Sequence, residues 1–183
     1  MRGNRVVAAL GALTGIRVLD FSWFGAAPIG TKILADHGAE VIRVESLMRL
    51  DLLRVLGTGH FRDYTPNLNG SGFFNDFNSS KYGITLNLNH AKGRDIARQL
   101  VAISDVVIDS FTRQAMRKWG LYYDDLVHIK PDIIVVSASQ QGHTGPHADY
   151  LGFGYNLQAL SGINHLTGYA DGYPLGTSVN YPD

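Results

Sequence analysis

Short apolar runs alternate with helix-like patterns along this chain, and this alternation limits the possible folds more than any other feature. Residues 16–21, Ile-Arg-Val-Leu-Asp-Phe, have the pattern of a buried strand. A helical pattern then runs from Pro28, which suits a first helical position, to His37, and Gly38 stands where a helix ends. Residues 39–45 form the next strand-like run. A strand, a short helix and a strand in such close succession predict a βαβ unit, and hence a parallel sheet with a right-handed crossover.

The alternation continues through the rest of the chain. Strands are expected at residues 83–88, 105–109, 132–137 and about 175–180, and helices at 90–104, 112–119, 123–130 and 155–162. The less regular stretches are residues 46–80, with a turn cluster at 67–72, and 139–155. The fold class predicted from this order is α/β, with an open, largely parallel, Rossmann-like sheet and flanking helices.

The composition excludes several classes of function. Lys plus Arg (16) equals Asp plus Glu (16), so no net charge favours nucleic acid or an anionic membrane as a partner. The chain has no cysteine, which excludes disulfides, zinc–thiolate sites and thiol catalysis. No apolar run approaches the ~18 residues of a membrane span. The start, with Arg2 and Arg5 before a short apolar run, faintly resembles a signal peptide, but residues 1–14 are expected to be an extension of a cytoplasmic protein.

Segments that follow the predicted strands are the candidate site, because ligands of open parallel sheets bind beyond the carboxyl ends of the strands. They are residues 22–27, 46 onward, 86–89, 110–112 and 139–142, and we expect them to meet at one rim. The first segment lacks the GxGxxG fingerprint of dinucleotide sites, with glycine only at Gly25 and Gly30. It still places backbone N–H groups at a helix N-terminus, where an anion or a developing oxyanion can be held. A tight turn with two packed aromatic residues explains the same spacing equally well.

Metal and serine-hydrolase chemistry have weak support in the sequence. His143 and His147 are four residues apart, but residues 145–146 are Gly-Pro, so the two rings share no helical face and no metal site is expected. Neither residues 70–72 nor 176–180 have the GxSxG spacing of a nucleophile elbow.

Two charged positions remain open on spacing alone. Lys118, with Arg117, stands near the end of a predicted helix, where it suits the helix dipole and a bound phosphate equally. Asp183 is the last residue, and a terminal Asp is most simply solvated.

Five blocks of sequence, in order, resemble the family III CoA-transferases, which also include the α-methylacyl-CoA racemases. They are residues 15–21 together with 34–45, 78–88, 105–111, 142–146 and 158–162. The resemblance runs from about residue 13 to 183. It implies that residues 15–183 are the N-terminal part of a Rossmann-like CoA-binding domain, cut off at the presumed nucleophile.

The resemblance also implies a set of site residues. The active-site carboxylate of the family falls on Asp183. The CoA-contacting positions fall on Gly25, Ala26, Ser46, Leu86, Asn87, Leu88, Asn89, Ser110, Phe111, Thr112, Lys118, Ser139, Gln140, Gln141 and Gly142. Departures from the family occur at Gly25 (Gln in some members), Lys118 (often Arg) and residues 140–141 (often Gly-aromatic), which leaves the acyl specificity open.

The chemistry implied by the resemblance needs only a carboxylate nucleophile. Asp183 would attack the acyl-CoA thioester to form an acyl-aspartyl anhydride, and the CoA thiolate would return to give an aspartyl-CoA thioester that a small carboxylic acid resolves. Backbone N–H groups of Gly25 and Ala26 are candidates to stabilise the oxyanions. No metal and no permanently bound cofactor are implied, since the coenzyme A thioester is a substrate.

Two alternatives to the transferase are an acyl-CoA racemase or epimerase and a non-catalytic CoA-binding module. Racemases of the family have a His just before the Ala-Leu-Ser-Gly block, where this chain has Phe153, so the transferase is favoured. Family members are longer and form interlocked homodimers. The resemblance therefore implies that this chain is a fragment with little or no activity alone, from a cytoplasmic homodimer.

Overall fold

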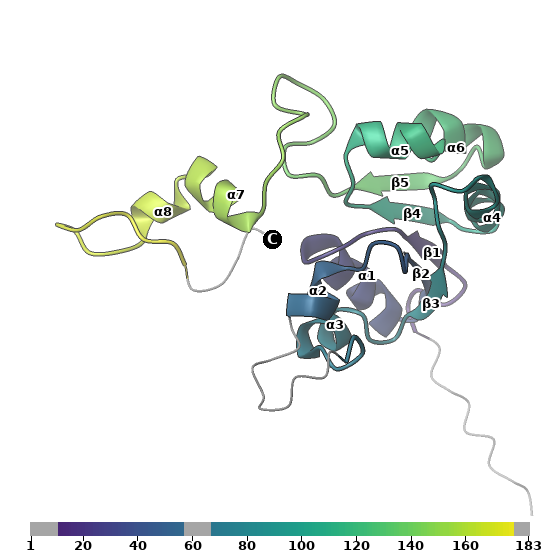
Figure 1. Ribbon diagram of the computed structural model, residues 1–183, viewed down its shortest axis with the longest axis horizontal. Coiled ribbons are helices and arrows are strands. Elements are labelled where there is room, and N and C mark those ends of the chain that lie inside the picture. The colour runs from purple at the N-terminus through teal and green to yellow at the C-terminus, as the bar shows by residue number, and fades with distance from the viewer. Residues whose placement is uncertain (1–10, 57–66, 178–183) are drawn as a thin grey trace, which may run out of the picture.

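The computed structural model describes residues 11–56 and 67–177, and these residues form a five-stranded sheet with the order β3-β2-β1-β4-β5 (Figure 1). The strands are β1 (Arg17–Asp20), β2 (Glu40–Glu45), β3 (Tyr82–Thr85), β4 (Val106–Asp109) and β5 (Ile134–Ser137). Every pair of neighbouring strands is parallel, so all their carboxyl ends lie along one edge of the sheet. The predicted α/β class with an open parallel sheet is confirmed.

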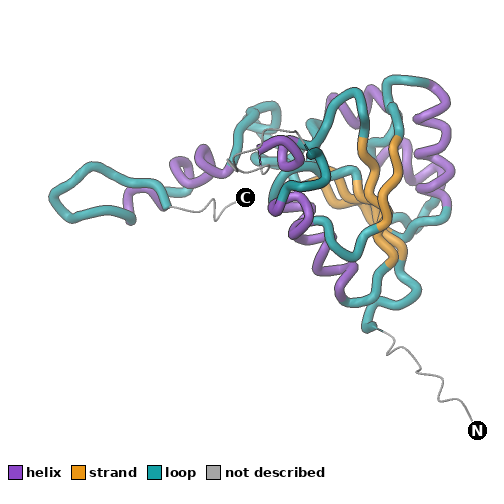
Figure 2. The backbone as a smooth tube through the Cα atoms, turned by 60° about the horizontal axis from the view of Figure 1, so that its bottom comes forward, coloured by secondary structure: helices purple, strands orange, loops and turns teal. Residues whose placement is uncertain are grey.

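Helices connect the strands and cover both faces of the sheet, as Figure 2 shows. They are α1 (Ala26–Asp36), α2 (Leu52–Leu56), α3 (Gly72–Phe77), α4 (Ala91–Ala102), α5 (Arg113–Trp119), α6 (Tyr123–Ile129), α7 (Gly154–Leu160) and α8 (Ile163–Leu166). On β1, Val18 packs in one core cluster with Ala35 of α1, and Leu19 packs in another with Val101 of α4. Val18 and Leu19 are therefore buried on opposite faces of the sheet, which is why β1 has apolar residues at consecutive positions.

The predicted elements agree with the structure except in three regions. Residues 46–80, predicted to be mostly irregular, contain α2 and α3. Helix α3 begins inside the predicted turn cluster, because the Ser71 hydroxyl accepts the Phe74 N–H and caps the helix. The strand expected at about 175–180 is wrong in its described part, since residues 175–177 are not in a strand, and 178–180 lie outside the described residues. Helix α8 was not predicted.

Helices α7 and α8 extend away from the sheet as an arm (Figures 1 and 2). Large apolar or aromatic side chains are exposed along it, at Leu160, Leu166, Tyr169 and Tyr173. No helix among the described residues is long and apolar enough to cross a membrane.

Candidate functional site

The carboxyl ends of the strands open onto a cavity of about 960 Å³. Its wall is formed by residues 21, 23–27, 44–46, 48–52, 86–89, 110–112, 115, 119, 138–140, 151–153 and 157. Each of the five strands thus contributes the segment that follows it, and the arm contributes Phe153 and Leu157. The expected meeting of these segments at one rim is confirmed.

Most of the positions predicted to contact CoA line this cavity. They are Gly25, Ala26, Ser46, Leu86, Asn87, Leu88, Asn89, Ser110, Phe111, Thr112, Ser139 and Gln140. Lys118, in the last turn of α5, and residues 141–142 are not part of the wall. The predicted nucleophile Asp183 lies outside the described residues. The roles of all these residues in binding or catalysis stay predictions.

The segment after β1 adopts an unusual backbone conformation at the cavity wall. Phe24 has φ 67°, in the left-handed region that a bulky residue rarely occupies. Gly25 caps α1, and Gly25 and Ala26 line the cavity where the first N–H groups of a helix have no intrahelical acceptors. The loop is tied to β4 because the Trp23 N–H donates to Ser110 Oγ at 2.8 Å.

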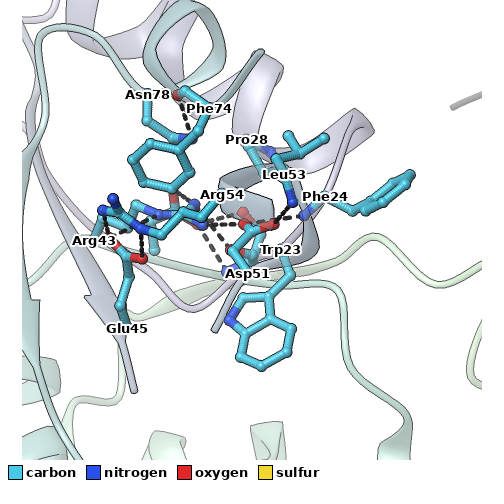
Figure 3. Close-up of polar contacts among 12 residues, drawn as sticks. Trp23, Phe24, Pro28, Arg43, Glu45, Asp51, Leu53, Arg54, Phe74 and Asn78 are labelled. Atoms are coloured by element: carbon cyan, nitrogen blue, oxygen red, sulfur yellow. Dashed lines mark hydrogen bonds and ion pairs between the residues drawn. The ribbon is translucent and has the colours of Figure 1, made fainter. Parts of the chain in front are cut away.

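A buried ion pair lies behind this segment (Figure 3). Arg43, on β2, donates from Nη2 to Asp51 Oδ2, and the two residues are 2% and 1% exposed. Arg43 Nη1 donates to the Ser22 carbonyl at 3.0 Å, while Asp51 accepts the N–H groups of Phe24 at 3.3 Å and Leu53 at 2.9 Å. The pair therefore connects the loop after β1 to the loop after β2.

A second ion pair supports the loop after β2. Arg54 of α2 donates to both oxygens of Glu45 at 2.7 Å, and its guanidinium lies 3.5 Å from the centre of the Phe74 ring. This bidentate geometry is the strong form of an Arg–carboxylate pair. Both acidic side chains of the cavity wall, Glu45 and Asp51, are thus engaged by arginines.

Lys81 joins three parts of the fold just below the site. Its ammonium lies 3.2 Å from Asp20 Oδ2 and donates to the Pro28 carbonyl and Asn78 Oδ1, each at 2.9 Å. Burial lowers the pKa of Lys81 to about 8, against the opposing effect of the Asp20 charge. Thr31 also donates to Asp20 Oδ2, at 2.6 Å, so this carboxylate anchors α1 to β1.

Asp109 closes the end of β4 beneath the cavity. It accepts hydrogen bonds from Ser137 Oγ at 2.7 Å and from the Phe111 N–H at 3.0 Å. Burial raises the pKa of Asp109, partly offset by these two donors. Asp109 thus fixes the backbone at Phe111, whose side chain lines the cavity.

Aromatic rings form one wall of the cavity. Phe111 packs edge-on against Trp23 and Trp119, with ring centres 5.3 and 5.1 Å apart. The Trp119 indole N–H donates to Asn89 Oδ1 at 3.2 Å. Arg49 is the one basic side chain in the described part of the wall, and its guanidinium lies 5.6 Å from the centre of Trp23.

Arg49 and Trp119 were not predicted as site residues. The signal for Arg49 is its place directly after a predicted strand, three residues beyond Ser46. The signal for Trp119 is weaker, since it lies in a helix and reaches the wall only through helix packing.

The arrangement combines apolar and aromatic surface with one cation and a helix N-terminus. Such a wall suits a ligand that has an aromatic part and anionic groups. Within residues 11–56 and 67–177, no group of three or more His, Cys, Asp or Glu side chains is placed to hold a metal ion.

Comparison with known proteins gives consistent results. The sequence model of CoA-transferase family III matches residues 13–183. The succinate–glutarate CoA-transferase of Agrobacterium fabrum is 34% identical over 93% of this chain, and the succinyl-CoA–L-malate CoA-transferase beta subunit of Chloroflexus aurantiacus is 36% identical over 89%. The chain spans 43% of the first relative and 39% of the second.

A solved structure has the same fold. The crystal structure of a CAIB/BAIF family protein from Brucella suis superposes with a TM-score of 0.85 at 34% identity. The match covers 94% of this chain and 45% of that protein.

Proposed function

Because this chain belongs to CoA-transferase family III, we propose that its cavity binds the coenzyme A part of an acyl-CoA and that the whole protein moves CoA from an acyl-CoA to a small carboxylic acid. The observation that carries the proposal is the convergence of five separate strand-end segments on one cavity. Its volume lies near the top of the roughly 300–1,000 Å³ of small-molecule sites, as an extended ligand requires.

The wall offers a complementary group for each part of CoA. We assign the adenine to the aromatic wall of Trp23, Phe111 and Trp119, since bases stack on aromatic rings. We assign a phosphate to Arg49, the basic residue of the described wall. The pantetheine arm then follows Leu86 and Leu88 toward the start of α1.

The proposed reaction proceeds through Asp183. Its carboxylate attacks the thioester carbonyl and the carbon–sulfur bond breaks. The products of this step are free CoA thiolate and an acyl-aspartyl anhydride. The thiolate attacks the aspartyl carbonyl and releases the donor acid. The acceptor carboxylate then displaces the thiolate to form a second anhydride, and attack of the thiolate on the acceptor carbonyl gives the new acyl-CoA and restores Asp183. N–H groups at Gly25 and Ala26 would stabilise the oxyanions, where one donor is typically worth ~10²–10³ in rate.

The names of the relatives support the class of substrates. The Agrobacterium and Chloroflexus enzymes are named for succinate, glutarate and L-malate, which are small carboxylic acids. The racemase alternative has no observation in its favour, because Phe153 lines the cavity against Phe24, with ring centres 5.5 Å apart, and carries no exchangeable proton there.

We further propose that residues 15–183 belong to one CoA-binding domain after an extension of residues 1–14, in a cytoplasmic homodimer. The exposed apolar residues of the arm support a dimer contact, since large exposed apolar patches mark interfaces. Because the chain spans less than half of its relatives, we propose that their remaining part is needed for turnover and that this chain alone has little or none.

Calorimetric titration of the 183-residue chain with CoA tests the binding proposal. We expect saturable binding that weakens in Phe111→Ala, which removes the central ring of the aromatic wall. Binding should stay unchanged in the control Tyr82→Ala, an exposed residue at the amino end of β3 and outside the wall. Absence of binding at millimolar CoA would reject the proposal. Mass spectrometry of the full-length protein with acyl-CoA tests the mechanism, and an adduct on any residue other than Asp183 would contradict it.

A further inference from the structure

The backbone at Phe24 needs an external support. Only Phe24 and Ser80, among the described residues other than glycine, have a positive φ. A bulky residue keeps such a conformation only when its surroundings hold it there. Phe24 directly precedes Gly25 and Ala26, the wall residues at the start of α1.

The support comes from the buried Arg43–Asp51 pair. Arg43 binds the carbonyl of Ser22, on one side of the turn, at 3.0 Å. Asp51 binds the N–H of Phe24, on the other side, at 3.3 Å. The pair thus holds the three-residue segment 22–24 at both of its ends, as Figure 3 shows for its Phe24 side.

The charged residues around the pair indicate that Asp51 is the carboxylate on which the Phe24 contact depends. Arg43 also lies 3.8 Å from Asp20 and 3.8 Å from Glu45, but Asp20 already binds Lys81 and Glu45 already binds Arg54. Asp51 is the carboxylate in hydrogen-bond contact with Arg43, and also the one that reaches Phe24. Removal of its charge therefore loosens the Phe24 contact and leaves Arg43 with only the more distant carboxylates of Asp20 and Glu45.

We propose that Asp51 is a positioning residue, which holds Phe24 in the left-handed conformation and so sets the N–H groups of Gly25 and Ala26 at the cavity wall. Its effect on CoA rests on the proposed function. Its effect on the loop rests only on the contacts described above.

Amide hydrogen exchange of Asp51→Asn tests the proposal directly. Hydrogen bonds to a charged group are worth about tenfold or more in an equilibrium. We expect exchange at Phe24, whose N–H donates to Asp51, to become about tenfold faster, with exchange at Val18 and Leu19 of β1 unchanged, and CoA affinity to fall about tenfold. The control is Glu40→Gln, which breaks the exposed Arg17–Glu40 pair on the same sheet. It should change neither the amide exchange rates nor the CoA affinity. Unchanged exchange at the Phe24 amide in Asp51→Asn would overturn the proposal.

A second background separates positioning from general stability. Glycine occupies positive φ without strain, so in Phe24→Gly the loop needs less support. We expect Asp51→Asn to weaken CoA binding by a smaller factor in the Phe24→Gly background than in the wild type, and equal factors would contradict the proposal. If Asp51→Asn does not fold, amide exchange of the wild type is the test. The Phe24 amide should exchange at least tenfold more slowly than in an unstructured peptide, and an equal rate would refute the role. Failure of the wild type to bind CoA would reject the proposed function while the exchange result still stands.

Discussion

The ammonium of Lys81 lies 3.2 Å from the carboxylate of Asp20, a residue 61 positions earlier in the chain. Both side chains are buried, at 2% and 0% exposure. With the Pro28 carbonyl and Asn78 Oδ1, the three donors of the ammonium have three acceptors. One side chain thus ties β1, α1 and the segment before β3 together beneath the site.

This contact predicts a pH dependence of stability. The pKa of Lys81 is about 8 in the folded protein and 10.5 ordinarily, so between these values the unfolded chain holds a proton that the folded protein lacks. The contribution of Lys81 to the free energy of unfolding is therefore lowest below pH 8 and rises toward pH 10.5. We expect the free energy of unfolding of the wild type, minus that of Lys81→Met, to increase from pH 8 to 10 in urea titrations. Lys92→Met, at an exposed lysine of α4, is the control, and a difference that falls with pH in Lys81→Met would contradict the prediction.

Substitution of Ala for Gly should have opposite effects on the free energy of unfolding at two positions. A Cβ on Gly93 of α4 would lie 2.1 Å from the carbonyl oxygen of Asn87, in a cavity-lining loop. Gly93→Ala should lower the free energy of unfolding by about 1–3 kcal/mol, the usual effect of overpacking. Gly30→Ala, inside α1 with open space around it, should raise it by about 0.5–1 kcal/mol. Urea unfolding of both variants checks this, and equal effects would show that the close approach at Gly93 is not limiting.

The sheet was predictable because its central strands β1 and β4 are buried on both faces. Val18 and Leu19 pack into different clusters and both are fully buried, so the strand is apolar at consecutive positions. The location of the site followed from the same fact, since parallel strands end at one edge. Helices α2 and α3 were missed because they are short, and α3 starts at Ser71 within residues typical of turns.

The interactions that shape the site were not predictable from local sequence. Arg43 is on a strand and Asp51 is in a loop, and neither position carries a signal that the two side chains are paired. The left-handed Phe24 depends on that pair, and propensity alone argues against it. The resemblance implies that Lys118 contacts CoA, and this stays a prediction; the residue lies outside the described wall, to which α5 contributes Ala115 and Trp119.

The tryptophans of the chain should report binding. The sequence has only two, Trp23 and Trp119, and both line the cavity. We expect CoA to change the intrinsic emission, and Trp23→Phe and Trp119→Phe each to keep part of the change, because a stacked base alters the surroundings of both rings. Excitation at long wavelength, with free N-acetyltryptophanamide as the control for absorption, checks this. No emission change at CoA concentrations that saturate the calorimetric signal would place the ligand elsewhere.

Arg49 should dominate the salt dependence of CoA binding. It is the basic side chain of the described wall, and CoA carries several phosphate charges, so Arg49→Ala should weaken binding about five- to tenfold at low salt. The difference should shrink as salt is raised, because an exposed charge pair is screened. Arg49→Lys keeps the charge but loses the planar guanidinium near Trp23. Its affinity for CoA should therefore lie between those of the wild type and Arg49→Ala. Arg17→Ala, at the amino end of β1 and outside the wall, is the matched control. Calorimetric titrations at several salt concentrations measure all four proteins, and equal losses in Arg49→Ala and Arg17→Ala would show that the phosphates bind elsewhere.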